Sequence, residues 1–259
     1  MSAQKWVAKV RKKYYIRNMI KNKYLPLVVA AVLAAGCHGA MSTRTYTDDM
    51  AMPAREGSTD SLLMSVSLEY FTSAGETAKA MNRTILSCAL DFENWDGPVE
   101  EAASAYRENL IDEYMTENSG ERTIAWEDRI TGEYTGAYKN WKNYLLTYYS
   151  YRGGPHGIQT VSPVTFDASG KALTEEDLFA DGYRQPLSEM LRKAVMDSMQ
   201  KEDQELADLV EAELIGPNGN FSVGPDGVQW LFQPYEVGPY ALGIVSATLS
   251  WKQLKPYLK

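Results

Sequence analysis

The sequence predicts an α+β fold, in which mixed or antiparallel sheets pack with helices in two small subdomains. Residues 62–70 alternate apolar and polar side chains, a pattern typical of a strand buried on one face. Residues 99–114 instead place their apolar side chains at helical spacing. Strand-like and helix-like segments follow one another without a regular βαβ alternation, and this mixture favours the α+β class.

The first subdomain is expected over residues 60–147. Its predicted elements are, in order, a strand at 62–70, a helix near Asn82, a helix that Pro98 opens and Asn118-Ser119-Gly120 ends, and strands at 124–134 and 141–152. The last of these strands has apolar side chains on both faces, so we expect it in the centre of a sheet.

The second domain is expected over residues 148–259. Its predicted elements are a strand at 160–166, a short helix that Thr174 and Asp177 open as a capping box, a helix from Pro186, strands at 228–232 and 244–249, and a last helical turn capped by Ser250. The turn Gly224-Pro225-Asp226-Gly227 predicts a hairpin that buries Val228, Trp230 and Phe232 on one face.

The charges are distributed unevenly along the chain. Residues 1–24 hold eight of the 26 basic residues and none of the 34 acidic ones. Residues 25–36 carry no charge, so the remaining chain has 18 basic residues, 34 acidic residues and a net charge of −16. The basic start precedes an apolar run at 25–35 that is too short to span a bilayer, as in a signal peptide.

The apolar run ends in Leu33-Ala34-Ala35-Gly36-Cys37, which resembles the lipobox of bacterial lipoproteins. The resemblance implies a signal peptide at 1–36, lipidation of Cys37, and a membrane-anchored, extracytoplasmic place in the bacterial envelope, in the periplasm or at the surface. Both Met1 and Met19 are compatible with the start of translation, and a short buried helix in a cytosolic protein is the alternative interpretation. Residues 37–59 lack periodicity and are expected to form a flexible tether.

The composition excludes several classes of protein. Of 259 residues, 44% are hydrophobic and 23% are charged, which excludes a disordered, collagen-like or disulfide-stapled chain. The net charge of −8 argues against nucleic acid as a partner. Because lipid on Cys37 would leave Cys88 as the one free cysteine, no intrachain disulfide is expected, and Cys88 is predicted to be a small buried side chain.

The residues do not assemble into a catalytic set. His156 is the one histidine of the body, and no nucleophile elbow, P-loop or dinucleotide fingerprint occurs. We therefore expect no catalytic residue, no metal and no cofactor. The acidic runs Glu127-Asp128 and Glu175-Glu176-Asp177 are interpreted as structural, on a strand and in the first turn of a helix.

Candidate binding residues come from two segments rich in glycine and proline. These residues are Gly154, His156 and Gly157 in the first segment and Tyr235, Glu236 and Tyr240 in the second. No strand pattern explains the two tyrosines, and exposed aromatic rings stack on sugars or anchor protein interfaces. In the alternative interpretation His156 only bonds the backbone of a tight turn.

Four motifs occur in a recognisable order, namely YYSYRGGPHG, VTFDASGKALTEEDLF, GPDGVQWLFQPYEVGPYALG and SWKQLKPYL. This order resembles the extracytoplasmic C-terminal domain of RsiV-type anti-sigma factors over residues 148–258, although Gly-Gly-Pro-His-Gly departs from the family's commoner Gly-Ala-His. Residues 60–147 resemble the companion domain more weakly. Similar domains also lie beside peptidoglycan deacetylase domains, and in the anti-sigma case the domain binds lysozyme.

The resemblance implies a binding or sensing module for a cationic protein of the lysozyme type or for a peptidoglycan fragment, attached to the membrane through Cys37. The net charge of −16 fits a cationic partner. Since the sequence shows neither an anti-sigma segment nor a deacetylase domain, those two activities are not expected. The alternatives are a hydrolase that acts on cell-wall glycan and a structural component of the envelope.

Overall fold

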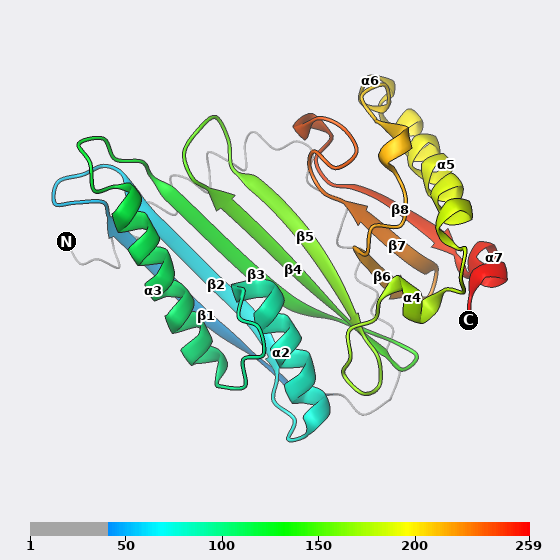
Figure 1. The fold of residues 1–259 in the computed structure, drawn as a ribbon, viewed down its shortest axis with the longest axis horizontal. Helices are drawn as coiled ribbons and strands as arrows, with labels where there is room; N and C mark the ends of the chain where they lie inside the picture. The colour runs from blue at the N-terminus through cyan, green and yellow to red at the C-terminus, as the bar shows by residue number, and fades with distance from the viewer. Residues whose placement is uncertain (1–40) are drawn as a thin grey trace. The chain divides into compact units, whose positions relative to one another are not determined.

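Two β-sheets, each packed against helices, make up the part of the chain that the structure describes (Figure 1). The structure is a computed structural model that describes residues 41–259. The strand order is β1-β2-β3-β4-β5 in the first sheet and β6-β7-β8 in the second. This mixture of sheets and helices confirms the predicted α+β class.

The first sheet consists of β1 (Thr43–Pro53), β2 (Ser61–Phe71), β3 (Trp126–Tyr138), β4 (Trp141–Tyr151) and β5 (Ile158–Phe166). Neighbouring strands are antiparallel except β2 and β3, which are parallel. A parallel pair needs a long crossover, which α2 (Glu76–Leu90) and α3 (Val99–Glu117) supply. Both helices cover one face of the sheet, where alternate residues of β2 from Leu62 to Leu68 are buried.

The second sheet consists of β6 (Phe221–Gly224), β7 (Gly227–Phe232) and β8 (Val245–Ser250). The helical segments of this half are α4 (Glu175–Leu178), α5 (Arg184–Glu202), α6 (Gln204–Ala207), η1 (Ala212–Leu214), η2 (Tyr240–Leu242), α7 (Trp251–Leu254) and η3 (Lys255–Tyr257). The helix predicted from Pro186 is α5, which buries Leu187, Leu191 and Val195 where it packs along β8.

The predicted hairpin is confirmed at β6 and β7. Gly224 pairs with Gly227, and Val228, Trp230 and Phe232 are each 0% exposed. Gly227 has a φ of +147°, and a Cβ atom there would lie 1.9 Å from the carbonyl oxygen of Leu249. Only glycine fits this position, because the backbone of β8 passes too closely for any side chain.

Two expected boundaries are wrong. Residues 43–53 of the expected tether form β1, which pairs with β2 from Thr43 to Pro53. The expected division at 147/148 falls inside β4, which is hydrogen-bonded to β3 on one side and β5 on the other. The two hydrophobic cores divide after β5, because one ends at Phe166 and the other begins at Leu178.

Three further expectations concern the leader and the cysteines. The signal peptide at 1–36 and the lipidation of Cys37 lie outside the described residues. Cys88 is exposed, in contrast to its prediction, because the buried stripe of α2 runs through Met81, Ile85 and Leu86 and leaves Cys88 beside it. Within residues 41–259, no helix is long and apolar enough to span a membrane.

Candidate functional site

The two predicted loops meet, although they lie about eighty residues apart in the sequence. The ring of Tyr240 stacks on His156 with 4.0 Å between the ring centroids and 20° between the planes. The Tyr240 hydroxyl donates to the carbonyl oxygen of Gly157 at 3.0 Å. The Tyr235 hydroxyl lies 3.4 Å from Nε2 of His156, at the limit of a hydrogen bond. We call Tyr149, His156, Tyr235 and Tyr240 the His–Tyr surface.

Tyr149 lies against the first loop, although it is not among the binding residues predicted from the sequence. A Cβ atom at Gly157 would lie 2.4 Å from the Tyr149 hydroxyl oxygen, so the two residues are in close contact. The guanidinium of Arg129 lies 4.3 Å from the centre of the Tyr149 ring, a cation–π contact. Burial and then Glu127 raise the pKa of Tyr149 above its usual range. The signal in the sequence that could have indicated Tyr149 was its place in the two-residue alternation of side chains along β4.

Tyr235 presents its side chain to solvent from a strained backbone. Its φ of +70° lies in the left-handed region, which residues other than glycine rarely adopt. The residue is 56% exposed. Such strain persists only where the surroundings hold it, and it is concentrated at binding and catalytic sites.

Glu236 supports the loop through hydrogen bonds within the protein. Its carboxylate accepts hydrogen bonds from the backbone N–H of Gln233 and from the side chain of Asn218, each at 2.7 Å. Gly154, the remaining predicted residue, has a φ of +100° and accepts a hydrogen bond from the Tyr151 hydroxyl at 3.0 Å. The structure therefore assigns both residues a supporting role in the loops.

Gln233 fastens the second loop to the edge of β5. Its side-chain oxygen accepts from the backbone N–H of Val161 at 3.0 Å, and its Nε2 donates to the Val161 carbonyl oxygen at 2.7 Å. Asn220 donates to the same carbonyl at 3.1 Å. The amide side chain of Gln233 thus pairs with backbone groups at the edge of β5, as a neighbouring strand would. Nothing in the local sequence pattern indicated this contact.

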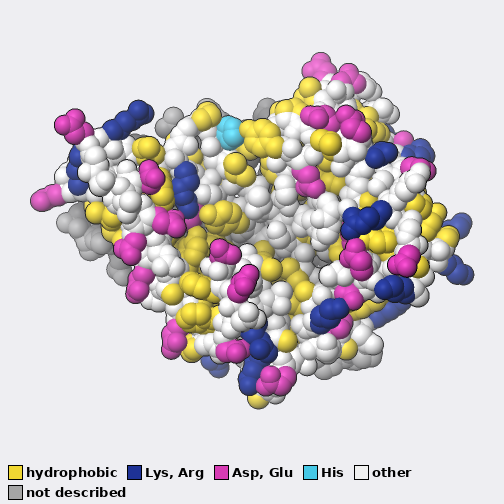
Figure 2. Space-filling model, in the orientation of Figure 1, with side chains coloured by type: hydrophobic (Ala, Val, Ile, Leu, Met, Phe, Trp, Pro, Cys, Tyr) yellow, Lys and Arg dark blue, Asp and Glu magenta, His cyan; other side chains and the backbone are white. Residues whose placement is uncertain are grey.

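An acidic segment adjoins the second loop. Glu211 donates its backbone N–H to the Val237 carbonyl at 2.9 Å, and a Cβ atom at Gly238 would lie 2.6 Å from the Leu209 carbonyl oxygen. The acidic segment comprises Glu202, Asp203, Glu205, Asp208, Glu211 and Glu213. Within residues 41–259, none of these carboxylates forms an ion pair. Figure 2 shows Asp and Glu side chains gathered where α6 lies in Figure 1.

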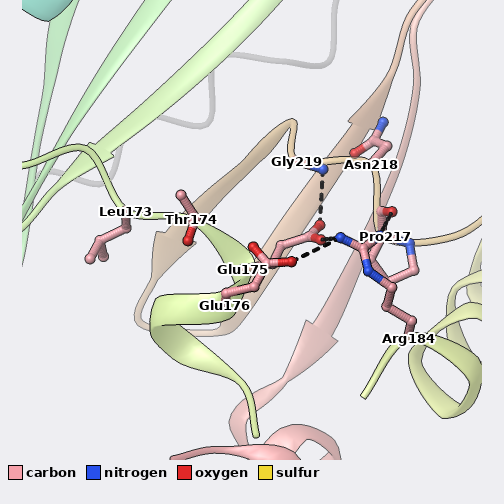
Figure 3. Close-up of a pocket in the computed structure, with 8 residues that line it drawn as sticks. All are labelled: Leu173, Thr174, Glu175, Glu176, Arg184, Pro217, Asn218 and Gly219. Atoms are coloured by element: carbon pink, nitrogen blue, oxygen red, sulfur yellow. Dashed lines mark hydrogen bonds and ion pairs between the residues drawn. The ribbon is translucent and has the colours of Figure 1, made fainter. Parts of the chain in front are cut away.

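A separate cavity of about 350 Å³ lies beside α4 (Figure 3). Its lining residues are Leu173, Thr174, Glu175, Glu176, Arg184, Pro217, Asn218 and Gly219, so it contains no residue of the His–Tyr surface. Glu175 is only 2% exposed. One of its oxygens accepts from Trp230 at 2.8 Å and from the Gly219 N–H at 3.0 Å, and the other accepts from the Tyr183 hydroxyl at 3.1 Å.

The carboxylates in this cavity are held by donors of the protein itself. Arg184 Nη2 lies 3.0 Å from Glu176 and 3.6 Å from Glu175. Burial raises the pKa of Tyr183, and its hydrogen bond to Glu176 raises it further. These contacts fix the start of α4 and α5 on the second sheet and support the structural interpretation of the acidic run. Among the described residues, no group of three or more His, Cys, Asp or Glu side chains is arranged to hold a metal.

The comparison with protein families matches the part of the chain that carries the second loop. Residues 176–252 match the DUF3298 family model. DUF3298 is described as a protein family of unknown function. The match includes the acidic segment, Tyr235, Glu236 and Tyr240, whereas His156 precedes it.

Solved structures resemble the chain over most of its length. A DUF3298 family member from Bacteroides fragilis is 20% identical with a TM-score of 0.75, and covers 85% of this chain and 94% of that one. A DUF3298 family protein from Pseudomonas aeruginosa is 14% identical with a TM-score of 0.65, at 85% and 95% coverage. At these identities the likeness concerns the fold alone. No curated protein sequence matches the chain.

Proposed function

We propose that this protein is a lipid-anchored binding module of the bacterial envelope, which docks a basic protein at the His–Tyr surface and the adjoining acidic segment. The observation that carries the proposal is Tyr235, an exposed aromatic ring held out by a strained backbone beside the stacked rings of His156 and Tyr240. Large, rigid aromatic side chains are frequent anchors of protein interfaces.

Charge and exposed apolar area support a basic partner. Leu209, which lies between the carboxylates of the acidic segment, and Leu214, which directly follows it, are 42% and 53% exposed. Apolar contacts flanked by unpaired carboxylates fit a partner that presents lysine or arginine around an apolar patch. The resemblance to the RsiV-type domain, which binds lysozyme, points to a lysozyme-like protein as the partner.

The docking experiment uses the full chain reconstituted in lipid nanodiscs, with hen lysozyme as the basic probe and an acidic protein of similar size as the control. We expect the association rate to fall as ionic strength rises from about 10 to 150 mM, because the screening length shortens from roughly 30 to 8 Å. Tyr235→Ala should raise the dissociation rate about 30-fold, as loss of an anchor worth about 2 kcal/mol would.

The matched control is Met115→Ala, which truncates a side chain on α3 that is 46% exposed. It should leave both rates unchanged. If lysozyme does not bind more tightly than about 1 mM, or if Met115→Ala weakens binding as much as Tyr235→Ala, the assignment of the partner site is wrong.

Membrane attachment through Cys37 is tested separately. Cys37→Ser should release the protein from the membrane fraction and abolish its labelling with palmitate. Stable anchoring needs more than one acyl chain. If the lipid on Cys37 has more than one chain, the native protein should resist extraction from the membrane by salt. Palmitate labelling that persists in Cys37→Ser would contradict the lipidation of this residue.

A cell-wall glycan is the second candidate ligand, because the exposed Tyr235 ring can stack on a sugar. Muropeptides should then bind with the same dependence on Tyr235 but with little dependence on salt. The hydrolase alternative predicts reducing-end products when the full chain is incubated with peptidoglycan. Binding of muropeptides without product formation would favour the binding module over the enzyme.

A further inference from the structure

A second surface lies where the turn between β3 and β4 meets α7. Tyr138 and Trp251 stack with 5.9 Å between their centroids and 18° between their planes, and Trp141 stacks on Trp251 at 6.1 Å. The ammonium of Lys139 lies 5.1 Å from the Tyr138 ring centre and 5.7 Å from that of Trp251. We call Tyr138, Lys139, Trp141, Trp251, Lys252 and Lys255 the Lys–Trp surface.

This surface has the opposite charge to the rest of the body. The segments 134–143 and 247–259 hold five lysines and no acidic residue, in a body whose net charge is −16. Lys139, Lys252 and Lys255 are exposed, and within residues 41–259 none of them forms an ion pair with a carboxylate. The Gly224 carbonyl oxygen, in the turn that contains Asp226, accepts a hydrogen bond from Trp251 at 2.9 Å.

The register of the first sheet places this surface at the end where the described chain begins. Thr43 pairs with Phe71, the last residue of β2. Since β2 and β3 are parallel, the last residue of β3, Tyr138, lies at this same end. Thr43 lies six positions after Cys37, and six extended residue steps span at most roughly 20 Å.

We propose that the Lys–Trp surface docks the body on a membrane that contains anionic phospholipids. The proposal rests on the lipid anchor proposed at Cys37, because a lipid there would keep Thr43, and with it this end of the sheet, within a short chain length of the bilayer. Lysines are attracted to anionic headgroups, and tryptophan and tyrosine rings favour the interface between headgroups and acyl chains. With this end on the membrane, α7 and the β3–β4 turn would both contact headgroups.

Fluorescence quenching tests the docking. The full chain is reconstituted in vesicles of phosphatidylcholine mixed with phosphatidylglycerol, in which part of the lipid carries brominated acyl chains that quench nearby tryptophan. We expect quenching that Trp251→Phe reduces, that salt weakens, and that is lower in vesicles of phosphatidylcholine alone. Every variant has the same sequence over residues 1–43, so the contribution of this part of the chain to quenching is constant.

Charge variants separate this surface from general attraction. Lys252→Gln with Lys255→Gln should reduce the docked population, with an equilibrium constant lowered about fivefold per lysine or roughly 25-fold in total. The control, Arg122→Gln with Lys201→Gln, removes the same charge elsewhere and should leave quenching unchanged. Equal quenching in both lipid mixtures, or an equal loss in the control, would overturn the proposal. So would binding to duplex DNA by a chain that shows no quenching, since the occupant would then be an anionic polymer.

Discussion

Asp128→Asn is expected to lower the free energy of unfolding by about 3 kcal/mol, because it removes one partner of a buried ion pair. Asp128 is 0% exposed and accepts two hydrogen bonds from Arg152, at 2.5 and 2.7 Å. The hydroxyls of Tyr106 and Tyr148 donate to it at 2.8 and 3.3 Å. The substitution leaves the Arg152 guanidinium facing a neutral amide.

The magnitude follows from the burial of the two partners. Breaking a fully buried ion pair costs about 3–5 kcal/mol. The side chain of Arg152 is 34% exposed, so water can solvate part of its unpaired charge. The lower end of the range therefore applies. Because Arg152 directly precedes Gly153, the same substitution should also loosen the first loop of the His–Tyr surface.

The assay is equilibrium unfolding in guanidinium chloride, with thermal unfolding in parallel. For a body of this size, about 3 kcal/mol corresponds to a fall in Tm of roughly 6–12 °C. Asp226→Asn, in an exposed turn, is the control and should change stability by less than about 0.5 kcal/mol. A loss below about 1 kcal/mol for Asp128→Asn would refute the reasoning, since it would show that the pair does not depend on its charge.

Three other substitutions test separate features. Trp230→Ala should cost about 3–5 kcal/mol in denaturant unfolding, as for other large core aromatics, and a loss under about 1 kcal/mol would mean that the hairpin face is solvated. Gln233→Leu should cost about 1–3 kcal/mol, because the Val161 N–H loses its partner and the Val161 carbonyl keeps only Asn220, and Gln159→Leu on the same strand should cost less. Lys171 and the start of α4 hold the pKa of Asp177 at about 2, below its usual 3.8. A carboxylate whose pKa is lowered in the folded state stabilises the protein at pH values above its unfolded pKa. Asp177→Asn should therefore destabilise the protein at neutral pH, and the difference in unfolding free energy between the two proteins should vanish as the pH falls from about 4 to 2. A constant difference across this range would contradict the role given to Asp177.

Local signals in the sequence determined most of the individual elements. Period-two alternation predicted β2, and helical spacing predicted α3 and α5, because side-chain burial repeats with the geometry of each element. Capping residues were equally local. The carboxylate of Asp177 accepts from the Thr174 N–H at 2.9 Å, and Ser250 caps α7. The two glycine- and proline-rich loops were identified as candidate binding segments for the same reason, since irregular backbone is encoded locally.

Only the tertiary structure decided which segments pair. The polar segment at 43–53 becomes a strand because β2 offers it an edge, and strand formation depends on the partner more than on intrinsic propensity. The contact between His156 and Tyr240, the Gln233 bonds to β5 and the burial of Asp128 each join residues distant in sequence. The exposure of Cys88 likewise follows from where α2 packs on the sheet. Periodicity predicts that a side chain has a buried face, whereas its neighbours on that face depend on strand order and register, which no local pattern contains.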